Sequence, residues 1–300
     1  MTLDPEHIPH FQSPAETDAN TLQGLLNENF IQESGGIDFH TFRVLTTVDK
    51  LEITKSGSMQ FRWRDENAYL NTAKCFLELE FYAYKDADKP LEIGDAVGAL
   101  NPLAHCLIDS IQVNIGETLL EENPKINQFL TKYVYLTQYS KQQQESFLKK
   151  MELCHFDADE TLTSDIAKTI TTTGTGATAV HAANSVQGQI YLDLLNKNKF
   201  CAMIMPVSAM QSLNTLIPAN IDVSFRYQIA DSCRFFVSSV AASKPLLKIT
   251  SAKMYVQACL LTPNALTRIH SRLSGGGTLQ LPYMAYVTRT FTVEQGHVYT

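Results

Sequence analysis

The sequence predicts an all-β protein with one helical insertion. Several segments alternate apolar and polar residues with the period of two that a strand with one dry face requires. In the clearest of them, residues 221–228, one face would carry Ile221, Val223, Phe225 and Tyr227, and the other Asp222, Ser224, Arg226 and Gln228. Residues 124–151 form the one long pattern with the spacing of an amphipathic helix. Glycine and proline separate many of these segments, as in folds built from short antiparallel strands.

Length and composition set the scale of the fold. The chain has 300 residues, of which 44% are hydrophobic, and this suffices for one large β domain or two ordinary ones. No apolar run approaches the roughly 18 residues of a spanning helix, and the N-terminus has no signal-peptide pattern, so we expect synthesis in the cytosol or nucleus. The six cysteines are widely spaced without a C-x-x-C pair. This spacing favours buried free thiols over a disulfide or zinc framework.

The charge is unevenly distributed. The net charge is -7, and residues 1–42 contain seven acids and neither lysine nor arginine, so the remaining 24 acids balance 24 bases. Because cations dominate affinity for nucleic acids, we expect no direct nucleic-acid binding. Residues 1–36 are proline-rich and polar and end in two glycines. They are predicted to form an arm, either a solvated tail or a segment that orders against a neighbouring subunit.

The first half of the chain contains four predicted strands and the helical insertion. The strands are residues 42–54, 59–63, 75–84 and 108–115, with a turn at Gly116-Glu117. Pro124 suits the first turn of the insertion, and Tyr133, Tyr135 and Tyr139 lie along it. These tyrosines fit either core packing or a subunit interface, where tyrosine is enriched.

The second half begins with a long loop rich in threonine, alanine and glycine, residues 154–185. A strand is predicted at 188–194, before Met205-Pro206. A helical turn at 208–216 then precedes the strand at 221–228. Further strands are predicted at 233–240 and 247–261, and the latter is long enough to be bent, bulged or shared between two sheets. A short helical piece after Pro263 and a glycine run precede a last strand, residues 286–293, which has no visible partner downstream.

The motifs that imitate enzyme sites lack the required context. Residues 174–179, with Asp193 about 20 residues on, imitate a dinucleotide fingerprint without its strand and helix. The acidic turn at 157–160 lacks the glycine and distal glutamate of a calcium loop. Cys154 and His155 are adjacent in sequence, which does not make a nucleophile and base. We therefore predict no catalytic, cofactor or metal site and no enzymatic activity.

About eight antiparallel strands in two packed sheets are jelly-roll architecture. The chain resembles the first half of the double-jelly-roll major capsid proteins of polinton-like, adintovirus-like and adomavirus-like DNA viruses. The resemblance spans roughly residues 40–300 and is carried by residues 108–116 with the helix after them, 188–194, 217–227 and 246–263. It implies a structural subunit that forms homotrimers and tiles an icosahedral shell, with itself and other capsid proteins as partners. It also implies a place in the virion, after synthesis in the host cytoplasm with assembly there or in the nucleus.

The resemblance implies a division of the chain into an arm (1–36), a jelly-roll domain (37–273), and a linker with the first strand of a second jelly roll (274–300). A second barrel would need on the order of 200 further residues. The sequence is therefore either truncated or that of a single-barrel relative, and we expect truncation because the strand at 286–293 has no visible partner. Two other classes stay open: a sandwich module that binds a receptor or glycan, as in a penton, spike or lectin, and an enzyme on a cupin-like barrel. The candidate subunit-contact residues are Asp222, Ser224, Arg226, Tyr133, Tyr135 and Tyr139.

Overall fold

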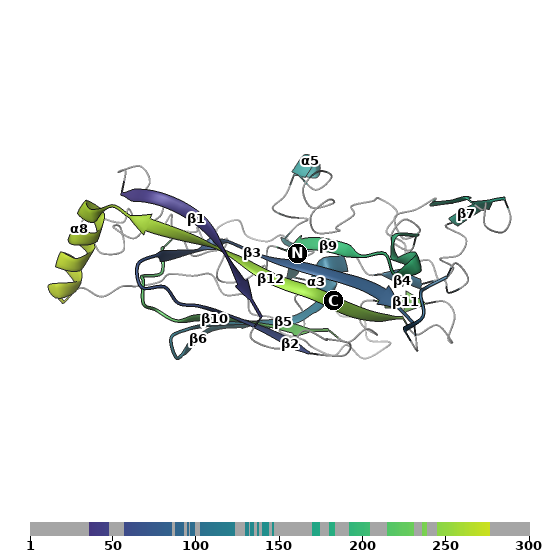
Figure 1. Cartoon of the computed structure of the whole chain (residues 1–300), viewed down its shortest axis with the longest axis horizontal. Coiled ribbons are helices and arrows are strands. Elements are labelled where there is room, and N and C mark those ends of the chain that lie inside the picture. The colour runs from purple at the N-terminus through teal and green to yellow at the C-terminus, as the bar shows by residue number, and fades with distance from the viewer. Residues whose placement is uncertain are drawn as a thin grey trace, which may run out of the picture.

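Two four-stranded antiparallel sheets face each other in the computed structural model of the chain (Figure 1). One sheet has the order β1-β12-β3-β9, and the other has the order β2-β10-β5-β6. The structure describes residues 36–47, 57–85, 88–92, 95, 97–99, 103–123, 170–174, 180–183, 192–204, 215–230, 236–238 and 245–276, and separate positions between 130 and 146.

The strand pairing is that of a jelly roll. The first sheet consists of β1 (Ile37–Thr46), β12 (Leu246–Leu261), β3 (Tyr69–Tyr84) and β9 (Phe200–Ile204). The second consists of β2 (Ser58–Trp63), β10 (Val223–Ile229), β5 (Ile108–Ile115) and β6 (Thr118–Asn123). Taken in chain order, the first of these eight strands pairs with the eighth, the second with the seventh, the third with the sixth and the fourth with the fifth. One long antiparallel hairpin rolled into two sheets gives this order, so the predicted fold class is confirmed.

Smaller elements connect and flank the sheets. Strands β4 (Val97–Ala99) and β11 (Phe236–Ser238) pair with each other, as do β7 (Ile170–Thr173) and β8 (Val180–Ala183). The helical elements are α3 (Leu103–Cys106), α5 (Lys141–Gln143), the 3-10 turn η7 (Leu195–Lys197) and α8 (Pro263–Ser274). In Figure 1, α8 lies at one end of the sandwich, and β4, β11 and β7 lie toward the other.

The core lies between the sheets. On β10 the predicted alternation is confirmed, because Val223, Phe225 and Tyr227 are at most 1% exposed, whereas Arg226 on the opposite face is exposed. Facing side chains come from both sheets, which is how a sandwich fills the space between its layers. The largest fully buried side chains are Tyr227, Phe61, Phe81, Phe225, Met59, Leu70, Leu77 and Leu79.

Strand β12 is bulged, as its length predicts. Its register on β3 shifts between Ile249 and Ser251 and again between Tyr255 and Gln257. The first shift changes which residues point inward, because Ile249 and Ala252 are both buried while Thr250 between them is only half-buried. Thr250 therefore does not lie on the buried face with Ala252, since a bulge changes the phase of the alternation.

The end of β12 belongs to a second, smaller core. Leu261 and Cys259 pack with Ile269 of α8 rather than with the main core. Thr262 caps α8 by accepting a hydrogen bond from the Ala265 amide at 3.5 Å, and Pro263 occupies the first turn. The Thr262 amide also donates to the Gly36 carbonyl at 2.8 Å. The helix expected after Pro263 is confirmed and is fastened to the start of β1.

Several sequence predictions are corrected by the structure. The strand predicted at 188–194 is wrong at its end, where residues 192–194 are helical; the strand before Met205 is β9. The loop predicted at 154–185 contains the β7–β8 hairpin, and Gly174 has a positive φ of 92° at its turn. Strand β6 was not predicted. Residues 48–56, 124–129, 147–169, 205–214 and 277–300 lie outside the described residues, and with them lie the strand predicted at 286–293 and most of the predicted helical insertion.

The turn predicted at Gly116-Glu117 is confirmed. It joins β5 to β6, with Ile115 paired to Thr118 across two connecting residues. Gly116 has a φ of 60°. A two-residue hairpin of type II′ needs a positive φ at its first central position, where glycine pays no steric cost.

Candidate functional site: the outer faces of the two sheets

The described residues contain no group of three or more His, Cys, Asp or Glu side chains arranged to hold a metal ion. Within the same part of the chain, no helix has the length and apolar character needed to cross a membrane. Cys75, Cys106 and Cys259 are buried free thiols, as predicted, whereas Cys201 is free but exposed. Cys154, His155, Asp157, Asp159, Glu160 and Cys233 lie outside the described residues. The surfaces left to consider are the outer faces of the two sheets and the ends of the sandwich.

The outer face of the second sheet carries three of the predicted contact residues. Ser224 and Arg226 point away from the core on β10, and Asp222 stands directly before this strand. The Arg62 guanidinium lies 3.3 Å from the Asp222 carboxylate, and the Asn114 side-chain amide donates to the Ser224 hydroxyl at 3.2 Å. This face is therefore polar from β2 across to β5.

Arg226 lies near the middle of that polar face. It is paired in register with Gln60 on β2 and Gln112 on β5. It is exposed, and no ion pair joins it to another described residue. An exposed guanidinium without an ion-pair partner on a polar face can bind a carboxylate or backbone carbonyls of a neighbouring molecule.

The predicted tyrosines are only partly placed. Tyr133 is 66% exposed, and its carbonyl accepts a hydrogen bond from the Thr137 hydroxyl at 2.9 Å. The neighbouring Thr131 and Val134 are buried, and the Thr131 hydroxyl lies 3.4 Å from Nδ1 of His105 in α3. Tyr135 and Tyr139 lie outside the described residues. Among the described residues, no hydrogen bond or ion pair joins Tyr133 to Arg226, and the assignment of Tyr133 to a subunit contact stays a prediction.

The outer face of the first sheet carries an aromatic patch that the sequence analysis missed. We define the aromatic patch as Phe42 and Val44 of β1, Tyr255 of β12 and Phe76 of β3. The rings of Phe76 and Tyr255 stack with centroids 4.7 Å apart, and the Phe42 ring lies 5.9 Å from that of Phe76. Phe42 is 52% exposed and Val44 49% exposed. No sequence motif marks this group, because the register of three strands assembles it.

A buried carboxylate adjoins the aromatic patch. Glu78 accepts a hydrogen bond from Lys253 at 3.1 Å through one oxygen and one from the Tyr255 hydroxyl at 3.1 Å through the other. This hydrogen bond to Glu78 raises the pKa of Lys253, and the bond to the same carboxylate raises the pKa of Tyr255. Both groups therefore keep their protons, and the Tyr255 ring is held in one orientation.

Arg43 of β1 links the two sheets. Its guanidinium forms an ion pair with Asp65 and lies 5.6 Å from the centroid of the Trp63 ring. The Asp65 carboxylate also accepts the amides of Asn67 at 2.9 Å and Ala68 at 2.8 Å. Burial by itself would raise the pKa of Asp65, but these two amides and Arg43 together lower it. A strand of one sheet is thus fastened to the loop that follows a strand of the other.

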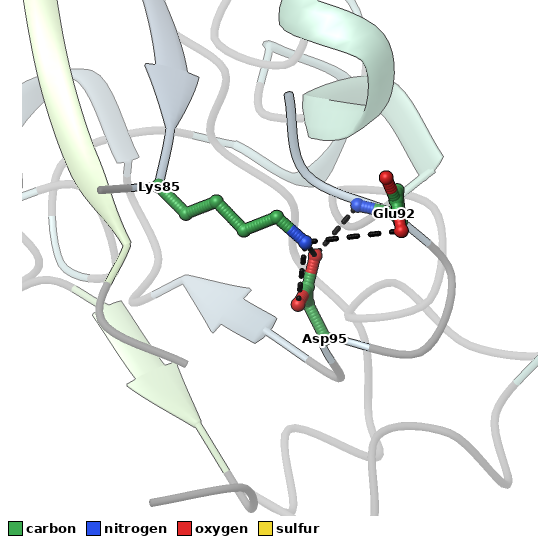
Figure 2. A network of polar contacts seen from close by, with 3 residues as sticks. All are labelled: Lys85, Glu92 and Asp95. Carbon is green, nitrogen blue, oxygen red and sulfur yellow. Dashed lines mark hydrogen bonds and ion pairs between the residues drawn. The ribbon is translucent and has the colours of Figure 1, made fainter. Parts of the chain in front are cut away.

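A polar network fastens the loop that follows β3 (Figure 2). Lys85 donates to both Asp95 oxygens at 3.1 and 2.9 Å and lies 3.8 Å from Glu92. The Asp95 carboxylate also accepts the Glu92 amide at 2.7 Å. The hydrogen bond to Asp95 raises the pKa of Lys85. Leu91 in this loop is fully buried, so the network holds an apolar anchor of the loop in the core.

A second ion pair joins the same loop to η7. Lys197 lies 2.9 Å from the Asp88 carboxylate and 5.7 Å from the centroid of the Tyr82 ring. The hydrogen bond to Lys197 lowers the pKa of Asp88. The Asn196 amide donates to the Leu91 carbonyl at 3.2 Å. The polar groups in these contacts are paired within the fold, so we interpret the contacts between η7 and the loop after β3 as structural.

Comparisons with known proteins place these faces in context. No protein-family model matches the chain, and no curated protein matches it. Among solved structures, it is similar to the Faustovirus major capsid protein, with 8% identity and a TM-score of 0.46 over 78% of this chain and 56% of that chain. It is also similar to a chain of the Sputnik virophage, with 8% identity and a TM-score of 0.46 over 76% and 49%. The mavirus major capsid protein has 14% identity and a TM-score of 0.34 over 75% and 48%.

The chain spans about half the length of the structures that it matches. Two of these structures are major capsid proteins, the class that the sequence resembles. The jelly-roll assignment itself rests on the pairing of the eight strands.

Proposed function

We propose that this chain is a structural capsid subunit that associates with copies of itself, as trimeric capsomers, to build an icosahedral viral shell. The observation that carries the proposal is the jelly-roll pairing of the eight strands, an architecture used by viral capsid and lectin domains. The sequence resemblance to double-jelly-roll major capsid proteins supports the same class. In this proposal the protein is not an enzyme and works through packing and surface contacts.

The proposed organisation follows the sequence boundaries. Residues 37–273 form the jelly-roll domain, residues 1–36 an arm, and residues 274–300 a linker leading to a second jelly roll. The partners are other copies of the chain and other capsid proteins, and the location is the virion. The acidic, base-free composition of residues 1–42 supports contacts with protein rather than with nucleic acid.

The polar outer face around Arg226 is proposed as one lateral contact between subunits. Its polar character and its donors that lack an ion-pair partner among the described residues suit a wet interface with hydrogen bonds, which is common between protein subunits. Reversing the charge at Arg226 would leave the core untouched, because the side chain is exposed. Assembly should therefore fail in a variant whose fold is intact.

The test compares the wild-type protein with the Arg226→Glu and Arg268→Glu variants. Arg268 is an exposed cation on α8, outside the outer faces of both sheets, so its reversal makes the same charge change elsewhere. Sedimentation velocity and negative-stain electron microscopy should detect trimers and shell-like particles for the wild type and Arg268→Glu, and fewer for Arg226→Glu. Equal assembly of both variants would make the Arg226 face ordinary surface.

The outcome for the wild type tests the function itself. A protein that stays monomeric and forms no particles under any condition would refute the capsid proposal. Binding on a glycan array without assembly would favour the alternative of a β-sandwich binding module. Stoichiometric iron or zinc in the purified protein would instead favour a cupin-like enzyme.

A further inference from the structure

The aromatic patch combines properties that folding alone does not require. Of the six large apolar side chains that the described part of the chain exposes, three lie on β1: Phe39, Phe42 and Val44. Strand β1 stands at an edge of its sheet and pairs only with β12 among the described strands. Natural proteins avoid leaving apolar edge strands open to water, because such strands promote association.

The patch is also rigid. Phe76 stacks on the Tyr255 ring and meets the Phe42 ring at a tilt of 56°, and Glu78 holds the Tyr255 hydroxyl. Arg43, the next residue after Phe42, ties β1 to Asp65. Aromatic groups that are already ordered lose little conformational entropy on binding, and this is the pattern of interface hot spots.

The charges around the aromatic patch point to a second copy of this chain as its occupant. Lys253 and Glu78 are paired with each other beside the patch, so these two charges do not oppose the approach of a second copy. The polar face of the other sheet differs, because Arg226 has no ion-pair partner among the described residues, so this face suits a different, acidic or carbonyl-bearing surface of a neighbouring copy rather than itself. Because the protein has a net charge of -7, two copies repel each other, and a surface with balanced charges is the place where they can associate.

We propose that the aromatic patch is a contact surface for a second copy of this chain, with Phe42 as its central anchor. The proposal rests on the self-association in the proposed function and names the surface that carries it. It places the apolar contact on the β1-β12-β3 face, separate from the polar lateral contact around Arg226.

A matched pair of variants on β1 tests the proposal. Phe42→Asp changes the patch, whereas Phe39→Asp changes an equally exposed ring, 55% against 52%, on the other face of the same strand. Phe42 pairs with Gln257 on the outer face, and Phe39 pairs with Leu260 on the face toward the core. The dissociation constant for self-association is measured by sedimentation over a concentration series, and unfolding curves confirm that each variant is folded.

Phe42→Asp should raise this dissociation constant at least about tenfold, as the loss of a hot-spot aromatic does, and Phe39→Asp should change it less than about threefold. If Phe42→Asp does not fold, Val44→Asp, two residues along on the same face, replaces it with the same expectation. Equal association of the wild type and the patch variant, or equal losses at Phe39 and Phe42, would overturn the proposal while leaving the capsid function standing. A strictly monomeric wild type would refute both.

Discussion

Adjacent residues on β10 provide a direct test of the two-layer fold. Phe225 is 1% exposed between the sheets, with Phe61 and Val113 opposite it on the neighbouring strands, and Arg226 beside it is exposed. Removing a buried phenylalanine side chain costs about 3–5 kcal/mol, because the transfer energy is lost and a cavity remains. Removing an exposed arginine side chain changes stability by about 0.5 kcal/mol or less. We therefore expect a large difference between Phe225→Ala and Arg226→Ala.

Urea unfolding measures this difference conveniently, because the sequence has a single tryptophan. Trp63 is 3% exposed and pairs with Val223, which lies two residues before Phe225 on the same face of β10. Its fluorescence should shift to longer wavelength when the sheets separate. The protein concentration must stay below the threshold of self-association, since association adds to the apparent stability.

The result that would refute the reasoning is specific. A loss below about 1 kcal/mol in Phe225→Ala would mean that this side chain is not in a packed core. A loss in Arg226→Ala equal to that in Phe225→Ala would mean that β10 does not have one dry and one wet face. Either result would remove the basis for placing Arg226 at a subunit contact.

Two further predictions concern single side chains. The Asp65→Asn variant should be less stable than the wild type by about 1–3 kcal/mol at pH 7. Because the pKa of Asp65 is lowered in the fold, this difference in stability should disappear as the pH falls through that lowered pKa. Unfolding curves recorded from pH 7 to 3 measure the difference. The control Asp222→Asn, in a more exposed ion pair with Arg62, should change stability by less than about 1 kcal/mol. When thiols are labelled at pH 8 and located by mass mapping, Cys201 should react before Cys75, because burial raises the pKa of Cys75 to about 12. Faster labelling of Cys75 than of Cys201 would contradict the place of Cys75 in the core.

The sequence predicts those parts of the fold whose side chains alternate. β5, β10 and β12 were found because apolar and polar residues alternate along much of each of them. β6, with the sequence TLLEEN, was missed because it shows no alternation, and β9 because five residues of mixed character give a weak signal. The bulge in β12 was expected from length, but its position depends on the register against β3.

The candidate site likewise has a part that the sequence could predict and a part that it could not. The outward direction of Ser224 and Arg226 follows from the alternation along one strand, so the sequence could predict it. The aromatic patch could not be predicted, because Phe42, Phe76 and Tyr255 belong to three distant segments. Only the pairing of the first strand of the jelly roll with the eighth, and of the eighth with the third, places their rings in contact.

Strand β1 illustrates how one strand can serve the fold and the assembly at once. On its inner face, Arg43 joins the two sheets through Asp65 and Trp63, and this contact holds an edge strand that would otherwise be supported only by β12. On its outer face, Phe42 stays half-exposed although Phe76 is available to cover it. Because the inner contact fixes the backbone, the outer ring is displayed in a defined position. An exposed aromatic on a flexible edge would invite indiscriminate aggregation, whereas one on a fastened edge can select a single geometry of association.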